Sequence, residues 1–213
     1  MESVFITGAT GYMGRHLIPR LLERGHRVRG LVRPGSEKKL VGGEAVVGDV
    51  LNAKDYPLSK QDTVVHLAGT PHPGPNKGPQ FRAFDLPSIL AAAEAAAQAS
   101  IKHFVYLSVA HPAPVMRDYI AVRSAGEQEL ERLKIPRTIL RPWYVLGPGH
   151  WWPYALKPLY WMALRSPTHR EAALRLGLVT IDQMIAALVM AIEHPSTTRR
   201  IIDAPAIAQK SHY

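Results

Sequence analysis

The stretch that decides the fold of this chain is VFITGATGYMG, residues 4–14. An apolar strand runs here directly into three glycines with the spacing G-x-x-G-x-x-G. In a strand-turn-helix unit of this kind, Gly8 permits the tight turn, Gly11 lets the backbone approach a pyrophosphate, and Gly14 lets the helix pack closely on the sheet. The helix start adds unpaired N–H groups and the positive end of its dipole, which favour an anion. The stretch therefore predicts a phosphate cradle.

The residues that follow favour a dinucleotide-binding βαβ unit over the plain alternative, a tight turn without a ligand. A helical pattern over residues 15–24 is closed by Gly25, and residues 28–33 form a second apolar strand. Pro19 falls within the first turns of this predicted helix, where a missing N–H costs little. We expect the turn to supply the cofactor-binding residues Gly8, Thr10, Gly11, Tyr12, Met13 and Gly14.

The end of the second strand predicts which dinucleotide binds. An Asp or Glu about twenty residues beyond the glycines would hold the ribose 2′-hydroxyl of NAD. This chain has Arg33 there. A guanidinium offers a planar fork of donors to a phosphate, so we expect NADP(H) in preference to NAD(H), which lacks the 2′-phosphate. The alternative is an arginine that only faces solvent at a strand end.

Length and composition limit what surrounds this unit. We expect residues 1–213 to form one domain with a well-buried core. The chain has no cysteine, which excludes a thiol nucleophile, a disulfide framework and a cysteine zinc site. The first strand begins almost directly after Met1, so we expect no signal peptide and a cytoplasmic protein.

The formal net charge of +9 does not come from a basic run. The lysines and arginines are scattered, and no DNA- or RNA-binding motif is present, so we expect no nucleic-acid partner. Solvation accounts for most of this charge, and part of the excess would attract a polyanionic dinucleotide.

Strand and helix patterns alternate along the rest of the chain. This alternation predicts an α/β fold with a doubly wound parallel sheet. Residues 44–48 and 62–69 are the third and fourth strands. Because ligands bind outside the carboxyl ends of such strands, we expect adenine and ribose contacts from Asp49, Val50, Leu67, Ala68 and Gly69. Asp49 is equally suited to cap the short helix that follows it.

The segment after the fourth strand, residues 70–79, is rich in proline and glycine. It is either a substrate lid at the same edge of the sheet or a passive surface loop. Asp85 is expected to be the N-cap of an alanine-rich helix that runs to Ser100. Near the C-terminus, residues 180–183 have the pattern of a capping box, and residues 200–203 that of a last strand.

A serine, a tyrosine and an arginine are expected near the nicotinamide. Residues 102–109 form the fifth strand, with Ser108 at its carboxyl end. Tyr119 and Arg123 are four residues apart at the start of the next helix, so they share one helix face. Ser108, Tyr119 and Arg123 are the candidate catalytic residues. The alternative for the last two is an ordinary amphipathic helix start.

With these motifs the chain resembles the short-chain dehydrogenase/reductase superfamily, in particular its atypical, NmrA-like and epimerase-like NAD(P)-binding members. The matching motifs are the TGATGYMG turn (7–14), GDV (48–50), HLAG (66–69), Ser108, Tyr119 and RPWYVLGPG (141–149). The resemblance implies a Rossmann fold with a small C-terminal substrate-side region. It adds Pro142 and Val145 to the cofactor contacts, together with Tyr119 and Arg123. It does not specify the substrate, because the superfamily hosts many reactions.

The resemblance also implies the roles of the catalytic candidates. Ser108 would hydrogen-bond the substrate oxygen, and Tyr119 would exchange a proton with it. The family has a lysine four residues after the tyrosine, where this chain has Arg123. A lysine grips the nicotinamide ribose and joins a proton relay, whereas an arginine keeps the charge but does not give up its proton. We therefore expect catalysis that is altered, slowed or lost.

Other kinds of catalytic site are not indicated. Ser108 lacks the flanking glycines of a hydrolase nucleophile elbow, and no Walker-type phosphate loop occurs. The ten histidines show no metal-ligand spacing, so we expect no metal. His66 lies inside an apolar strand and is interpreted as a core histidine with satisfied hydrogen bonds.

Residues 147–179 form a small substrate or interface segment whose aromatic side chains concentrate over residues 150–164. The segment includes Trp151 and Trp152 and is interrupted by Lys157 and prolines, so we expect no integral membrane span. Several interpretations of this segment remain open. It could form the wall of an apolar substrate pocket, an interface to a second copy or a protein partner, an interfacial membrane helix, or a helix packed into the core.

Two functions remain. The first is an NADP(H)-dependent oxidoreductase that moves a hydride between the nicotinamide and a small, apolar carbonyl or quinone-like substrate. The second is a non-catalytic, NmrA-like sensor of NADP(H) with a protein partner. Ser108 and Tyr119 together favour the enzyme, and Arg123 favours the sensor. A nucleotide-sugar epimerase or dehydratase ranks third, because the C-terminal region is short for a sugar-nucleotide pocket.

Overall fold

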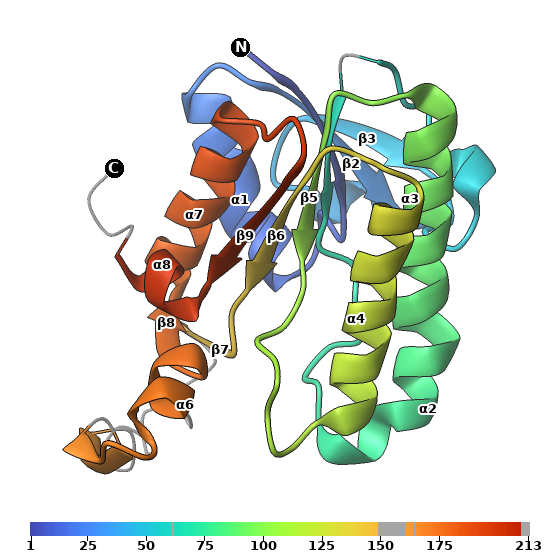
Figure 1. Cartoon of the computed structure of the whole chain (residues 1–213). Helices are drawn as coiled ribbons and strands as arrows, with labels where there is room; N and C mark the ends of the chain where they lie inside the picture. Colours follow the sequence, from blue (N-terminus) through green and yellow to red (C-terminus); the bar gives the residue numbers. More distant parts are fainter. Residues whose placement is uncertain (61, 149–160, 164, 210–213) are drawn as a thin grey trace.

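The computed structural model describes residues 1–60, 62–148, 161–163 and 165–209. Its centre is a seven-stranded sheet in the order β3-β2-β1-β4-β5-β6-β9, with parallel neighbours throughout (Figure 1). This confirms the α/β fold with a parallel sheet. The strands are β1 (Ser3–Thr7), β2 (Arg27–Val32), β3 (Glu44–Val47), β4 (Asp62–His66), β5 (His103–Leu107), β6 (Arg137–Arg141) and β9 (Arg199–Asp203).

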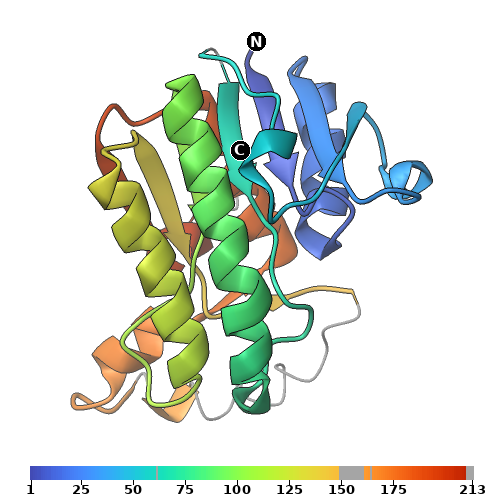
Figure 2. The ribbon, with the colours of Figure 1, turned by 90° about the vertical axis from the view of Figure 1, so that its right-hand side faces the viewer.

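Helices cover both faces of the sheet, so it is doubly wound as predicted. Helices α1 (Tyr12–Glu23) and α7 (Ile181–Glu193) pack together on one face (Figure 1). Helices α3 (Leu86–Ala99) and α4 (Arg117–Arg132) lie side by side on the other (Figure 2). Strand β1 serves both cores because side chains alternate along a strand: Val4 and Ile6 pack with α1 and α7, and Phe5 packs toward α3.

Short elements complete the chain. A second, two-stranded parallel sheet pairs β7 (Tyr144–Leu146) with β8 (Leu178–Thr180), and the sequence pattern did not predict it. The predicted capping box at Thr180 is confirmed, since both of its hydrogen bonds are present. The remaining short elements are η1 (Glu37–Lys39), η2 (Ala53–Asp55), η3 (Pro75–Lys77), α2 (Gly78–Gln80), the π-helical turn η4 (Phe81–Asp85), α6 (Arg170–Arg175) and α8 (Ala204–Ala208).

The order of the strands creates a crevice at one edge of the sheet. From β1 the chain proceeds outward to β2 and β3, and it then returns to place β4 on the other side of β1. The connections after β1 and β4 therefore leave in opposite directions from adjacent carboxyl ends. Ligands of open α/β sheets bind at such a switch point.

Two local expectations are wrong. Helix α1 begins at Tyr12, earlier than predicted, so Pro19 lies inside the helix rather than in its first turns. An interior proline costs about 3 kcal/mol. Burial of Leu17, Ile18 and Leu21 on the sheet offsets this cost, because packing of the apolar face supplies most of a helix's stability. Asp85 precedes α3 at the N-cap position, but it has helical backbone angles and its side chain makes no capping hydrogen bond.

Candidate functional site

Two of the three glycines in the β1–α1 turn, Gly8 and Gly14, have the backbone roles expected of them. Gly8 has a positive φ of +69°, and a Cβ on it would lie 2.7 Å from the backbone of Leu67. A Cβ on Gly14 would lie 2.3 Å from the carbonyl oxygen of Ala9, so only glycine lets α1 approach the turn this closely. Gly11 has ordinary extended angles, and a Cβ there would meet only the Gly8 oxygen, at 3.1 Å, among the described residues. The side of Gly11 that faces the cleft is therefore open.

The N-terminus of α1 is suited to an anion. Gly11 is its N-cap, no side chain caps it, and no acidic residue lies in its first turn. The first N–H groups of a helix have no partner within the helix, and its dipole is positive at this end. A phosphate at this point would receive those hydrogen bonds.

A cleft of about 740 Å³ lies in front of this turn, at the carboxyl ends of the strands. We call it the β1–β4 cleft. The residues that the sequence predicted for the cofactor and that line this cleft are Gly8, Thr10, Gly11, Arg33, Val50, Leu67, Ala68 and Gly69. The lining also includes Thr70, Pro71 and Lys77 from the loop that was predicted as either a lid or a passive surface loop. The lining residues that the sequence analysis did not name include Arg15, Ser36, Lys39, Gln80 and Phe84.

The lining of the β1–β4 cleft is basic. Its described residues include Arg15, Arg33, Lys39 and Lys77 and no acidic residue. Among the described residues, the first three form no ion pair, and the ammonium of Lys77 donates to the carbonyl oxygen of Pro71, at 2.7 Å, and to no carboxylate. The cleft thus presents positive charge that is not neutralised within this part of the chain. The run Arg33-Pro-Gly-Ser-Glu-Lys-Lys39 was the sequence signal for part of this basic lining.

Other predicted cofactor residues lie outside the lining. Asp49 is exposed, and its carboxylate accepts a hydrogen bond from the amide of Leu51 at 2.9 Å, so it stabilises a turn. The short helix η2 is capped by Asn52 instead. Tyr12, Met13 and Val145 pack against the apolar core, and Pro142 is buried, with its carbonyl bonded to the amide of Ala110. Gly14 supports the turn from behind.

Ser108 is buried, and its hydroxyl is already engaged. Its Oγ donates to Oε1 of Glu127 at 2.6 Å. Glu127 also accepts two hydrogen bonds from Arg141, one of them from Nε at 3.0 Å. Burial would raise the pKa of Glu127, but the bonds from Arg141 and Ser108 outweigh it and lower this pKa. A carboxylate held ionised in this way is a poor general base, which agrees with the prediction that Ser108 is no hydrolytic nucleophile.

Glu127 was missed at the sequence level, although it follows Arg123 by four residues on the same helix face. We expect Glu127→Gln to lower the free energy of unfolding by on the order of 3 kcal/mol at neutral pH, because it leaves Arg141 without its carboxylate. The folded-state pKa lies below the ordinary value of 4.5. The stabilisation is therefore complete above this value and is lost as the pH falls through the folded-state pKa. Urea unfolding of the wild type and Glu127→Gln should show that the difference in their free energies of unfolding shrinks as the pH falls below 4.5.

The control for this measurement is Glu94→Gln on the exposed face of α3. A gap between wild type and Glu127→Gln that stays constant down to strongly acidic pH would contradict the assignment of the lowered pKa.

Tyr119 and Arg123 do lie together, as the helix spacing predicted. The guanidinium carbon of Arg123 is 5.0 Å from the centroid of the Tyr119 ring. The other neighbour of Tyr119 is Phe81, with ring centroids 4.9 Å apart. Tyr119 is partly exposed, whereas Arg123 is only 5% exposed, and neither lines the β1–β4 cleft. A cation against the ring favours negative charge that develops on the phenol oxygen.

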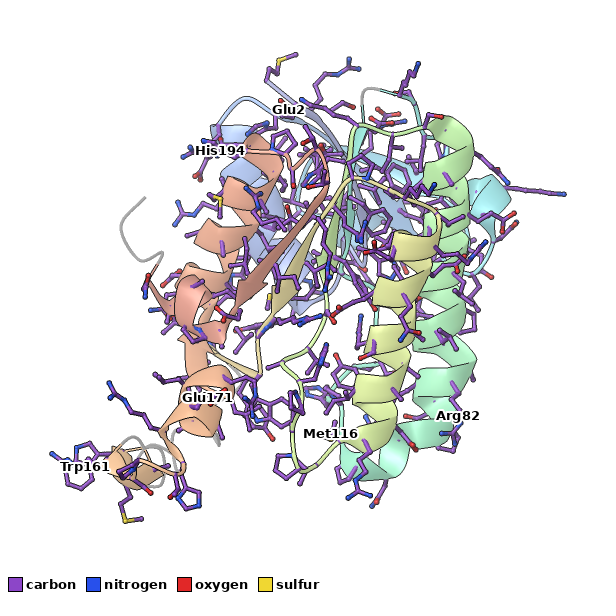
Figure 3. All side chains as sticks on the ribbon, viewed as in Figure 1. Glu2, Arg82, Met116, Trp161, Glu171 and His194 are labelled. Carbon is purple, nitrogen blue, oxygen red and sulfur yellow. The ribbon has the colours of Figure 1, made fainter. Side chains whose placement is uncertain are left out.

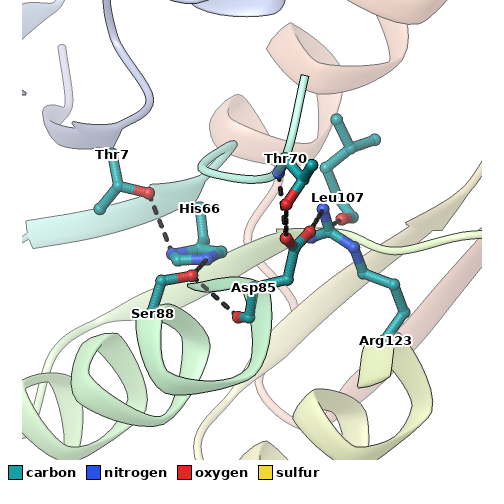
Figure 4. Close-up of polar contacts among 7 residues, drawn as sticks. All are labelled: Thr7, His66, Thr70, Asp85, Ser88, Leu107 and Arg123. Atoms are coloured by element: carbon teal, nitrogen blue, oxygen red, sulfur yellow. Dashed lines mark hydrogen bonds and ion pairs between the residues drawn. The ribbon is translucent and has the colours of Figure 1, made fainter. Parts of the chain in front are cut away.

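Hydrogen bonds within the protein compensate the buried charge of Arg123. Its Nη1 donates to the carbonyl oxygen of Leu107 at 3.2 Å, and its Nη2 donates to Oδ1 of Asp85 at 3.0 Å (Figure 4). Oδ2 of Asp85 accepts from both the amide and the hydroxyl of Thr70, at 3.0 and 2.5 Å. Asp85, which was expected to cap a helix, therefore hydrogen-bonds to Thr70 in the cleft lining and to Arg123.

His66 is a satisfied core histidine, as predicted. Its Nδ1 is 2.9 Å from the hydroxyl of Thr7, and its Nε2 is 3.4 Å from the hydroxyl of Ser88 (Figure 4). Burial, with a smaller effect of Arg123, lowers the pKa of His66 to about 3, so it is neutral at physiological pH.

Most of the aromatic segment, residues 149–160 and 164, lies outside the described residues, including Trp151 and Trp152. Trp161 is described and is 59% exposed, with the guanidinium of Arg165 stacked 3.4 Å from its ring centroid. It lies at the end of the molecule beyond α6 (Figure 3). Among the described residues no helix is long and apolar enough to cross a bilayer. Nor do three potential metal-ligating side chains gather anywhere in the same ranges.

Comparison with known proteins assigns the family. The model of a family described as NAD(P)H-binding matches residues 8–148. A ceramide reductase from Caulobacter vibrioides is 31% identical over 193 residues, which are 87% of this chain and 59% of that protein. A UDP-glucose 4-epimerase from Vibrio cholerae is 26% identical over 94% of this chain and 69% of its own length. The chain therefore spans less than two thirds of the ceramide reductase.

Solved structures share the fold. The enzyme WbmH from Bordetella bronchiseptica, in complex with NAD+, has a TM-score of 0.69 at 21% identity, over 96% of this chain and 76% of that one. A short-chain dehydrogenase/reductase superfamily protein from Agrobacterium tumefaciens, with bound NAD, has a TM-score of 0.68 at 19% identity, over 98% of this chain and 81% of that one. The matched residues 8–148 contain the whole β1–β4 cleft. The match over residues 8–148 shows that this chain belongs to the NAD(P)H-binding family.

Proposed function

We propose that this protein is an NADP(H)-dependent oxidoreductase that transfers a hydride to or from a small, apolar carbonyl or quinone-like substrate, with Tyr119 as the acid/base. The observation that carries the proposal is the β1–β4 cleft, whose lining, in the part of the chain that the structure describes, has four cations and no carboxylate. Binding of NAD by a Rossmann protein commonly uses an acidic residue on the ribose 2′-hydroxyl. The cleft lining of this chain has no such residue and has Arg33 at the end of β2.

The positions of the cations fit a dinucleotide with an additional phosphate. Arg33, Ser36 and Lys39 follow β2 and line the cleft together, so a guanidinium, a hydroxyl and an ammonium are available to a 2′-phosphate. Arg15 follows the glycine turn, where the helix N-terminus would receive the pyrophosphate. The NAD that the titles of two structural neighbours name belongs to those proteins. The preference of this chain is proposed from its own side chains.

A nicotinamide bound in the cleft would supply or accept the hydride, and side chains of the protein would donate or accept the proton. Tyr119 gives its phenolic proton to the substrate oxygen as the oxygen gains charge, or takes it back in the oxidative direction. The Arg123 guanidinium places positive charge 5.0 Å from the centroid of the tyrosine ring during this transfer. The Ser108 hydroxyl uses its only proton in the hydrogen bond to Glu127, so in this arrangement its oxygen can accept a further hydrogen bond but not donate one.

We expect Arg33→Asp to lower the ratio of NADPH to NADH affinity by about ten- to a hundredfold. The change removes charge-assisted hydrogen bonds to the 2′-phosphate, each worth about 1.5–3 kcal/mol, and introduces repulsion. Titration of both reduced dinucleotides by fluorescence measures the ratio. Arg27→Asp is the matched control, since Arg27 is exposed at the opposite end of β2 from Arg33 and does not line the β1–β4 cleft. An unchanged ratio in Arg33→Asp would remove the support for NADP(H).

A non-catalytic NADP(H) sensor is the second candidate, because Ser108 and Arg123 are both engaged within the protein. Such a sensor would oxidise no NADPH with any aldehyde, ketone or quinone, while its binding to a partner would differ between NADPH and NADP⁺. The ceramide reductase relative favours a reductase, and the relative named as a UDP-glucose 4-epimerase keeps an epimerase as a third candidate.

A further inference from the structure

A single buried carboxylate, that of Asp85, contacts both the lining of the β1–β4 cleft and the helix that carries Tyr119 (Figure 4). One oxygen accepts the amide and hydroxyl of Thr70, which lines the cleft. The other oxygen accepts Nη2 of Arg123 from α4 at 3.0 Å. Asp85 is 1% exposed and Arg123 is 5% exposed, so water does not compete effectively for these bonds.

The ion pair also supports the cleft lining from behind. A Cβ on Gly69 would lie 2.4 Å from Nη2 of Arg123 and 3.1 Å from Oδ1 of Asp85. Gly69 and Thr70 line the β1–β4 cleft. The Asp85–Arg123 pair therefore packs directly against the segment on which the cofactor would rest, and glycine at position 69 leaves the room for it.

The same pair reaches the proposed proton donor. The Arg123 guanidinium is held between Asp85 and the carbonyl oxygen of Leu107, and in this position it lies over the Tyr119 ring. Buried charges of this kind are stable only while their partners remain in place, so the contacts form and break together.

We infer that Asp85 is a positioning residue that couples the cofactor cleft to the helix of the proton donor, and that Arg123 acts on the cofactor only through it. The inference rests on the proposed cofactor site, and its Tyr119 part rests on the proposed reaction. It gives Arg123 a different role from the lysine of the family, which contacts the nicotinamide ribose. The two roles predict opposite effects of Arg123→Lys.

The experiment is a double-mutant cycle on the full chain, read by NADPH fluorescence titration. Asp85→Asn keeps the size of the side chain but places an amide N–H₂ against donors, and we expect NADPH affinity to fall about tenfold. Arg123→Lys should also weaken NADPH binding, although residue 123 does not line the cleft, because one ammonium cannot keep both contacts of the guanidinium. The double variant should bind no more weakly than Asp85→Asn alone. Glu94→Gln, a carboxylate-to-amide change on the exposed face of α3, should leave affinity unchanged.

Two outcomes overturn the inference. Affinity at or above the wild-type value in Arg123→Lys means that a lysine here contacts the ribose directly, and additive effects in the cycle mean that the two residues act independently. A melting curve for every variant confirms that binding is measured on folded protein. If Asp85→Asn does not fold, a cycle between Thr70→Val and Arg123→Lys replaces it, since each removes contacts on one side of the carboxylate only.

Hydrogen exchange adds a readout that needs no cofactor. The amide of Thr70 donates to Asp85, so Arg123→Lys should accelerate its exchange if the arginine holds the carboxylate in place. Unchanged exchange contradicts the coupling. If the wild-type protein binds NADPH but does not oxidise it with any tested substrate, the proposed reaction is refuted. The coupling is then decided by NADPH affinity and by hydrogen exchange. Wild-type protein that binds neither NADPH nor NADH overturns both.

Discussion

Replacement of Tyr119 by phenylalanine should lower turnover by about two to four orders of magnitude and leave NADPH affinity within about threefold of the wild type. The hydroxyl is the proposed proton donor, so its loss acts on the chemical step. The ring keeps its packing against Phe81 and beneath Arg123, so the local structure remains. The decrease in NADPH absorbance with a panel of aldehydes, ketones and quinones measures turnover, and fluorescence titration measures affinity.

Ser108→Ala is the informative comparison for this variant. The Ser108 hydroxyl donates to Glu127 and not outward, so its removal should reduce turnover less than removal of the Tyr119 hydroxyl. Turnover that does not depend on Tyr119 would refute its catalytic assignment. A loss of NADPH affinity as large as the loss of turnover would make Tyr119 a cofactor ligand instead of the proton donor.

The second large effect is expected from Gly11→Val, which should weaken NADPH binding by at least about a hundredfold without unfolding the protein. Gly11 has φ −78° and ψ 178°, which valine adopts without strain, and its added side chain would extend into the open side of the turn. There it would occupy the space of a phosphate that receives two or more charge-assisted hydrogen bonds, each worth about 1.5–3 kcal/mol. Titration of NADPH, with a melting curve for the same sample, measures both properties.

Two further glycine variants make this result specific. Gly74→Val places valine at an extended position with no described atom within 4 Å and outside the cleft lining, so affinity should be unchanged. Gly14→Val should destabilise the fold itself, because its Cβ would lie 2.3 Å from the oxygen of Ala9. Wild-type affinity in a folded Gly11→Val variant would refute the phosphate cradle.

The parts of the site that could be predicted are those that depend on local sequence patterns. The G-x-x-G-x-x-G spacing, the arginine at the end of β2 and the residues after β4 are local patterns, and all three contribute to the β1–β4 cleft. Gln80 and Phe84 were not predicted because they lie in the short turns after the proline- and glycine-rich loop, which carry no regular pattern. The error at Asp85 has the same origin. An aspartate ahead of an alanine-rich helix has the local pattern of an N-cap, and only the positions of Thr70 and Arg123 direct its side chain elsewhere.

The sequence by itself determined the parallel α/β architecture, the phosphate turn and the basic end of β2, because short-range periodicity and backbone requirements specify these features. The tertiary structure alone decided the partners of the buried charges. Glu127 meets Ser108 and Arg141, and Asp85 meets Thr70 and Arg123, across elements that are distant in the chain. A charged side chain removed from water must find a partner wherever packing places one. The partner of each buried charge depends on how the strands and helices assemble, and the local spacing of residues does not predict this assembly.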